Sequence, residues 1–351
     1  MDGELKNFMK VSLTIMVSLL YSYFIASKLP KGKFRLFSLF PVFSLFAVLP
    51  LFLSSVFLTG TVAFFITWLT TFKLFLFSFN LGPLVSNPPL TFPLFVSVAC
   101  LPIKIKPKET DPDYKNLKKY SNPKLGLNLP TKILLFAILI AAADRIDRLR
   151  SNVKLCVYCA TLYLFVDVLL GVSSAFVQLA FDGVELEPSS NEPYLATSLQ
   201  DFWGRRWNLL VSNTLRYGIY KPVRATVEGV VGQQWAAGMA VMAVFVASGV
   251  MHEQLVYYIT REVPTWEVTW FFVLQGVCVV VEFELKAVVG RRWRPPTVVA
   301  WWLTLAFLLV TAAWLFFPPL LKAGIFSGLL RELKMLEEFV WKLILSLFQK
   351  G

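Results

Sequence analysis

Histidine is almost absent from this chain: His252 is the only one in 351 residues. Di-iron sites built from histidine boxes and two-histidine zinc helices need several imidazoles at helical spacing, so this scarcity excludes both and most other metal sites. Cysteine is also rare. Of the four cysteines, Cys156 and Cys159 have the spacing of a redox pair but lack its βαβ context, and we interpret them as packing residues.

Charged residues are scarce as well. They make up 16% of the chain, against roughly 25% in soluble domains, while hydrophobic residues make up 56% and the mean hydropathy is +0.63. A backbone in lipid satisfies its polar groups only in helices or closed barrels, and the apolar runs here have helix length. We therefore predict an all-α, polytopic membrane protein of about eight to ten helices, forming a single domain over residues 1–351 with no soluble domain.

The expected helical segments follow the apolar runs. They are 11–27, 36–58, 61–79, 90–103, 131–143, 153–181, 235–259, 268–289 and 298–317, with a further membrane-associated helix near 323–348. The runs 90–103 and 131–143 are too short to cross comfortably, so we expect them to be re-entrant or packed inside the protein. The first segment lacks a small-residue cleavage site and is predicted to be a retained anchor.

Positive charge predicts the orientation of the chain. The connection after the first span carries Lys28, Lys31, Lys33 and Arg35 without an acid, which places it in the cytoplasm. The loop 104–132 and the cluster of Lys286, Arg291, Arg292 and Arg294 are expected on the same face. The net charge of +12 fits lipid headgroups or a phosphorylated cofactor, and ordinary topogenic signalling explains it too; we expect no nucleic-acid partner.

His252 lies inside the apolar run 235–259, where an ionisable side chain is costly and by default functional. Imidazole is the side chain best suited to proton transfer near neutral pH. Glu253 follows it directly but points about 100° away around a helix. The other candidate carboxylate partners are Asp167, Asp201 and Glu282, each of which is better explained by structural pairing between helices than by catalysis.

Between about 182 and 234 the chain is too polar to span a membrane and too aromatic to be a flexible linker. On a continuous helix, Asp201, Arg205 and Asn208 would share one face, with Trp203 and Trp207 on a neighbouring stripe. A belt at the membrane interface, with anchoring tryptophans and snorkelling arginines, is the alternative.

Three motifs carry a resemblance to a known family: Asn191–Asn208 (NEPYLATSLQDFWGRRWN), Ser248–Glu253 (SGVMHE) and Trp266–Cys278 (WEVTWFFVLQGVC). Weaker matches occur at Pro30–Gly32, Phe72–Phe77 and Leu101–Lys104, so most of the chain is covered. The sequence resembles the plant wax synthase-like branch (long-chain-alcohol O-fatty-acyltransferases) of the membrane-bound O-acyltransferase (MBOAT) superfamily.

The resemblance implies a fold, a reaction and roles for residues, and it places the catalytic motifs within about 187–290. His252 matches the family's catalytic histidine, and Asn208 matches the polar residue that closes its tryptophan-rich motif. Acyl-CoA would be the cosubstrate, with no permanently bound cofactor, and a lipid alcohol the acceptor, in the endoplasmic reticulum. A long-chain alcohol would give wax ester; diacylglycerol, with donors as short as acetyl-CoA, and sterols are the alternatives.

General chemistry gives these residues plausible tasks. His252 could act as general base, and the Asn208 amide could hold the oxyanion or orient the acceptor, or simply form a structural hydrogen bond. Arg205 and Arg206 could bind the phosphates of coenzyme A or lipid headgroups. The predicted substrate-binding residues are Asp201, Trp203, Arg205, Arg206, Trp207 and Glu253.

Two other classes of protein fit poorly. The chain has no Gly-x-Ser-x-Gly elbow and no aspartate five residues after His252, which excludes the common hydrolase motif and the soluble acyltransferase motif. A transporter would be expected to show internal repeats and charged residues along a path, and the chain has no visible repeat.

Overall fold

The computed structural model describes residues 2–106, 127–142, 150–289 and 295–348. Within these ranges the regular elements are helices, and a single antiparallel bridge joins Ile105 to Leu186. The predicted all-α membrane fold is confirmed. Seven described stretches are long and apolar enough to cross a membrane: Gly3–Lys28, Lys33–Phe52, Val56–Ser78, Val153–Ala180, Gln233–Thr260, Glu267–Val288 and Thr297–Lys322.

The amino-terminal spans consist of α1 (Asp2–Phe24), α2 (Lys33–Val48), and a third segment in which α3 (Val56–Thr61), η3 (Val62–Thr70) and α4 (Thr71–Ser78) are continuous. The predicted boundary between 36–58 and 61–79 is wrong, because the chain leaves the helix at residues 53–55. Ser55 caps α3 by accepting a hydrogen bond from the Leu58 N–H, and Glu4 accepts from the Ser54 and Ser55 N–H groups. The apolar run in the sequence continues across this break, and the two serines within it did not indicate a helix end.

The two short predicted segments are short helices, α5 (Phe92–Cys100) and α7 (Leu129–Ala141). The carboxyl end of α5 is bound by a buried cation: Lys73 Nζ donates to the carbonyl oxygens of Val98 and Leu101, at 2.6 and 2.7 Å. The expected helix near 323–348 is α17 (Ile325–Phe348).

The polar segment 182–234 folds into short helices, and the prediction of one continuous helical face is wrong. It contains α10 (Leu199–Asp201), η5 (Phe202–Arg206), α11 (Leu209–Leu215), η6 (Arg216–Tyr220) and α12 (Lys221–Val231). The helix stops at Trp207, which is extended, and Asn208 has a φ of 38°. Asp201, Arg205 and Asn208 therefore do not lie on one helix face.

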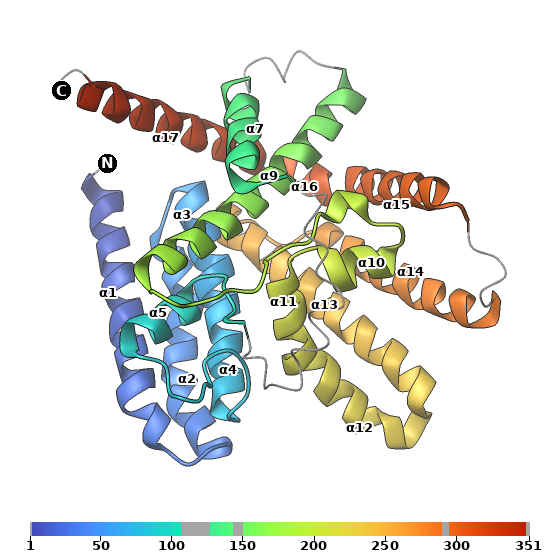
Figure 1. The fold of residues 1–351 in the computed structure, drawn as a ribbon, viewed down its shortest axis with the longest axis horizontal. Helices are drawn as coiled ribbons and strands as arrows, with labels where there is room; N and C mark the ends of the chain where they lie inside the picture. Colours follow the sequence, from blue (N-terminus) through green and yellow to red (C-terminus); the bar gives the residue numbers. More distant parts are fainter. Residues whose placement is uncertain (1, 107–126, 143–149, 290–294, 349–351) are drawn as a thin grey trace.

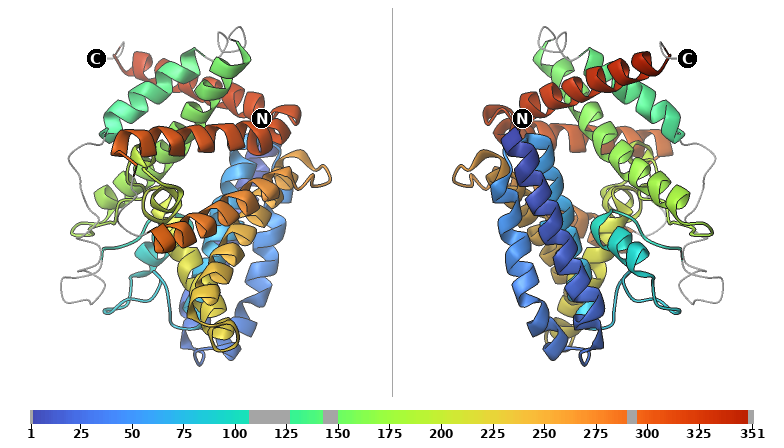
Figure 2. Two further views of the ribbon diagram at one scale, coloured as in Figure 1. Left: turned by 90° about the vertical axis from the view of Figure 1, so that its right-hand side faces the viewer. Right: turned by 90° about the vertical axis from the view of Figure 1, so that its left-hand side faces the viewer.

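The remaining long helices are α9 (Ser151–Ala180), α13 (Gln233–Thr260), α14 (Glu267–Val289) and α15 (Thr297–Thr311), which runs through η8 (Ala312–Phe316) into α16 (Phe317–Lys322). In Figures 1 and 2 the connection from α1 to α2 lies at the same end of the molecule as the α12–α13 junction, and the amino terminus lies at the opposite end. The basic turn that is predicted to be cytoplasmic therefore lies at the same end of the molecule as the α12–α13 junction. Residues 107–126 of the predicted basic loop, and Arg291, Arg292 and Arg294, lie outside the described residues.

A close contact between α13 and α14 positions the centre of the molecule. A Cβ at Gly249 would lie 2.9 Å from the Cα of Thr269, so the two backbones touch there. One turn further on, the buried Glu253 carboxylate caps α14 by accepting from the N–H groups of Trp266, at 2.7 Å, and Thr269, at 3.2 Å. Packing and capping together fix the register of the two helices.

We expect Gly249→Ala to destabilise the protein by about 1–3 kcal/mol, because the added methyl group meets the backbone of α14. Gly238→Ala is the matched control on the same two helices. Its Cβ would make an ordinary contact, 3.5 Å from Val280, and should be neutral or stabilising by up to about 1 kcal/mol. Thermal inactivation in detergent measures both, and equal inactivation temperatures for the two variants would contradict the register argument.

Candidate active site

His252 projects from α13 into an aromatic pocket. Its ring lies 4.4 Å from that of Phe272, 6.2 Å from Phe316 and 6.5 Å from Phe64, centroid to centroid. His252 Nδ1 lies 2.8 Å from the carbonyl oxygen of Ser248, one turn earlier on the same helix. A carbonyl oxygen only accepts hydrogen bonds, so in the neutral ring Nδ1 carries the proton and Nε2 is left as the proton acceptor.

The imidazole lies on the wall of a cavity of about 1110 Å³. One face of α13 lines this cavity from Gln233 to Ile259, with His252 toward its carboxyl-terminal part. At 1.5 Å per residue, the stripe extends about 39 Å along the helix. The cavity is large enough for long substrates to lie on both sides of the histidine.

Departures from α-helix occur where the chain meets this cavity. The described π-helical segments are η3, η5, η6 and η8, and each contributes side chains to the wall. Phe64 comes from η3, Trp203 from η5, Arg216 from η6 and Phe316 from η8. A π segment widens the helix and changes the direction of its side chains, and such segments are frequent at functional sites.

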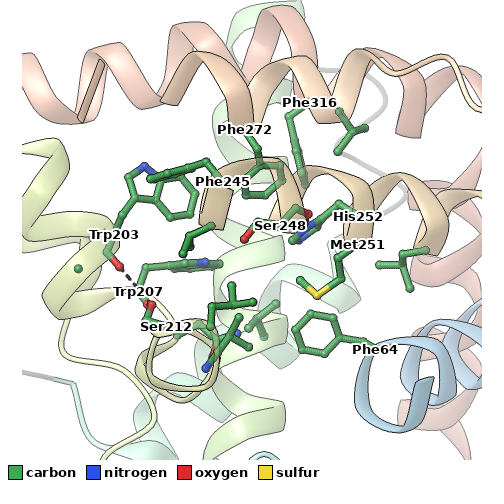
Figure 3. Close-up of a pocket in the computed structure, with 18 of the residues that line it drawn as sticks. Phe64, Trp203, Trp207, Ser212, Phe245, Ser248, Met251, His252, Phe272 and Phe316 are labelled. Atoms are coloured by element: carbon green, nitrogen blue, oxygen red, sulfur yellow. Dashed lines mark hydrogen bonds between the residues drawn. The ribbon is translucent and has the colours of Figure 1, made fainter. Parts of the chain in front are cut away.

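The tryptophan-rich motif reaches the histidine through aromatic contacts. Trp203 lies 5.8 Å from the Phe272 ring that packs on His252, and Figure 3 shows Trp203 and Trp207 to one side of the imidazole. The Trp203 indole donates to Gln275 Oε1 at 3.1 Å. Gln275 is fully buried and donates in turn to Thr311, so this chain of hydrogen bonds ties the motif to α14 and α15.

Asn208 caps a helix and also lines the cavity. Its left-handed backbone conformation is one that asparagine tolerates better than most residues, and its Oδ1 accepts from the Val211 N–H at 3.3 Å to cap α11. Asn208 is buried and lines the cavity, with the side-chain NH₂ as its donor group. Trp203, Trp207, Asn208 and His252 are thus the predicted site residues that the fold brings to one cavity.

Arg206, predicted to bind the phosphates of coenzyme A, is held by contacts within the protein. Its Nε donates to Asp201 at 2.6 Å, and its Nη1 donates to the carbonyl oxygens of Asn191 and Glu192. Asp201 pairs with Arg206, and its role in substrate binding stays a prediction. Arg205 is also not among the side chains that line the cavity.

The acids proposed as partners of His252 are engaged elsewhere. Asp167 pairs with Lys132 at 2.8 Å and accepts from Ser190. Glu282 accepts from the Leu199 N–H at 2.8 Å and pairs with Lys286. Glu253 caps α14 and does not pair with His252, as its direction around the helix suggested; its role in substrate binding stays a prediction.

Several cavity residues went unpredicted. Arg216, Tyr220 and Arg224 line it at intervals of four, and Gln233 and Gln234 line it beside them. The four-residue spacing was visible in the sequence, but the polar stripe was indistinguishable from a solvated helix face. Gln275 is an amide inside an apolar span, and the cost of burying a polar group there could have marked it as a residue that contacts the site.

An imidazole on the wall of a large, mainly apolar cavity inside a helical membrane protein is typical of a membrane-embedded site for lipid-like molecules. The model of the membrane-bound O-acyl transferase family matches residues 186–274. A probable long-chain-alcohol O-fatty-acyltransferase 3 from Arabidopsis thaliana is 42% identical over 97% of both chains. An acyl-CoA–sterol O-acyltransferase 1 from the same plant is 40% identical over 93% of this chain and 94% of its own. The chain belongs to the membrane-bound O-acyltransferase family, as the sequence motifs implied, and is an integral membrane O-acyltransferase.

We expect Glu253 to affect stability and not substrate affinity. Glu253→Ala removes the α14 cap and leaves its N–H groups without this acceptor, which costs about 1–3 kcal/mol. Glu253→Gln keeps an acceptor and should be milder. The inactivation temperature and the KM for each substrate test this expectation. A raised KM with unchanged stability in either variant would support a role of Glu253 in substrate binding.

Proposed function

We propose that this acyl-CoA:alcohol O-acyltransferase esterifies a long-chain fatty alcohol, giving a wax ester and coenzyme A, in the endoplasmic reticulum membrane. The observation that carries the proposal is the position of His252, with Nδ1 fixed by Ser248 and the ring on the cavity wall. The names of similar plant proteins favour a long-chain alcohol. The sterol enzyme among them and the size of the cavity keep sterol, and diacylglycerol with a donor such as acetyl-CoA, as the second candidates.

His252 acts as the general base. Its Nε2 accepts the proton of the alcohol while the alcohol oxygen attacks the thioester carbonyl carbon, and the proton then passes to the sulfur as the C–S bond breaks. Among the described residues, the acids considered as partners are paired with other groups, and His252 has the Ser248 carbonyl and the tilted ring of Phe272, at 4.4 Å, beside it. No carboxylate among them holds the positive charge of the protonated ring. The imidazolium is therefore short-lived, and the leaving thiolate is the natural recipient of its proton.

Asn208 supports the developing negative charge. With Oδ1 capping α11, its NH₂ group is the donor available to the carbonyl oxygen of the thioester as that oxygen becomes anionic. The cap also holds the amide in one orientation. Preorganisation of this kind is what makes an oxyanion donor effective.

Coenzyme A enters from the polar end of the cavity. Arg216 and Arg224 line that end with Gln233 and Gln234, and they supply the guanidinium groups that suit phosphates. The Arg224 Nε atom is buried without a hydrogen bond and lies 3.6 Å from Glu228 Oε2. These two arginines replace Arg205 and Arg206 as the proposed phosphate ligands.

The test supplies the purified enzyme, or membranes that lack neutral-lipid synthesis, with labelled acyl-CoA and with fatty alcohol, diacylglycerol or sterol. We expect wax ester from the wild type and a loss of about 10²- to 10⁴-fold in His252→Ala at equal protein level, because the base is gone. Full turnover by the folded variant would refute the base. A preference for sterol or diacylglycerol would show that the fatty alcohol is the wrong acceptor. Absence of ester with every donor and acceptor would refute the proposed reaction.

Asn208→Asp separates the two roles of the amide. The carboxylate keeps an acceptor for the Val211 N–H but removes the NH₂ donor, so we expect folded protein with turnover about 10²- to 10³-fold lower. Asn208→Gly tolerates the same backbone and also lacks the donor, and should lose activity to a similar degree. Near-normal turnover in either folded variant would assign the amide a structural role alone.

A further inference from the structure

The two ends of the cavity differ in polarity and in access. At one end Arg216, Gln233 and Gln234 are exposed, so this end opens to the surface. At the other end the wall consists of buried or half-buried apolar side chains from α3, α9, α13 and α17. It includes Phe57, Gly60, Phe165, Ile259, Phe326 and Leu329. We call this second region the closed end.

Glu332 joins two helices at the closed end. Its Oε1 accepts from the Val56 N–H at 2.9 Å, and its Oε2 accepts from the Phe57 N–H at 2.8 Å and from the Ser55 hydroxyl at 2.9 Å. This carboxylate joins α17 to the start of α3, one turn after the cavity-lining Leu329. A carboxylate at a helix amino terminus forms strong hydrogen bonds, so this wall is fixed and not a flexible lid.

The direction of the acyl chain follows from the thioester. Its carbonyl carbon must lie beside His252, and the sulfur and the acyl chain leave that carbon on different sides. With coenzyme A at the polar end, the acyl chain points toward the closed end. Ile259 is seven residues beyond His252, which is about 10 Å along α13, a distance that a fatty acyl chain spans.

We infer that the closed end receives the terminus of the acyl chain and that its depth sets the longest acyl group the enzyme transfers. This inference rests on the proposed function. Gly60 is the critical position, because a Cβ there would have only Ile259 Cδ1 near it, at 3.7 Å. Glycine at this point in α3 leaves space that any larger residue would fill.

The experiment measures kcat/KM for acyl-CoA donors of increasing length with one alcohol, and for alcohols of increasing length with one donor. Gly60→Val and Leu329→Phe should lower kcat/KM for the longest donors by about 10- to 200-fold and move the optimum to shorter ones. Activity with short donors should persist, which shows that the variants fold. Leu336→Phe, on the exposed part of α17, is the matched control and should leave the profile unchanged.

Two further variants complete the test. Phe57→Ala enlarges the closed end and should extend the profile to longer donors, while Arg224→Gln should raise KM for donors of every length without moving the optimum. If Gly60→Val and Leu329→Phe shift the alcohol profile instead, or neither profile, the inference is overturned. Absence of ester with the wild type for every donor would overturn the proposed function itself.

Discussion

The approach of α13 and α14 at Gly249 is the constraint on which the site depends. The two backbones touch there, and the Glu253 carboxylate, one turn later, caps the start of α14. His252 lies between these two points, and Phe272 on α14 packs against its ring. The contact that joins the helices therefore also sets the position of the proposed base, so a substitution that changes the packing here also moves the imidazole.

Half-buried acids around the site hold the protein's own groups. Asp201 neutralises Arg206, Glu282 holds the start of α10, and Glu332 holds the start of α3. Each acid satisfies backbone N–H groups or a half-buried cation that would otherwise be costly inside a membrane protein. His252 is left with a carbonyl oxygen and aromatic rings, an environment suited to a neutral base that carries its proton only briefly.

The cavity has a polar part and an apolar part. Its arginines and glutamines suit a phosphorylated, water-soluble cosubstrate, and its apolar walls suit lipid chains. The π-helical segments η3, η5, η6 and η8 give up regular hydrogen bonding where they meet the cavity, which turns large side chains toward it.

The sequence by itself determined the membrane class, most of the helices and the singular position of His252, because hydropathy and the cost of burying an ionisable group are local properties. Its motifs also identified the family. Only the tertiary structure decided that Asn208 begins a new helix instead of continuing the preceding one, that Arg206 and Glu253 bind other groups of the protein, and that Arg216 and Arg224 reach the cavity. Those outcomes depend on which groups from distant segments satisfy one another's hydrogen bonds and charges, and spacing along one chain segment does not contain that information.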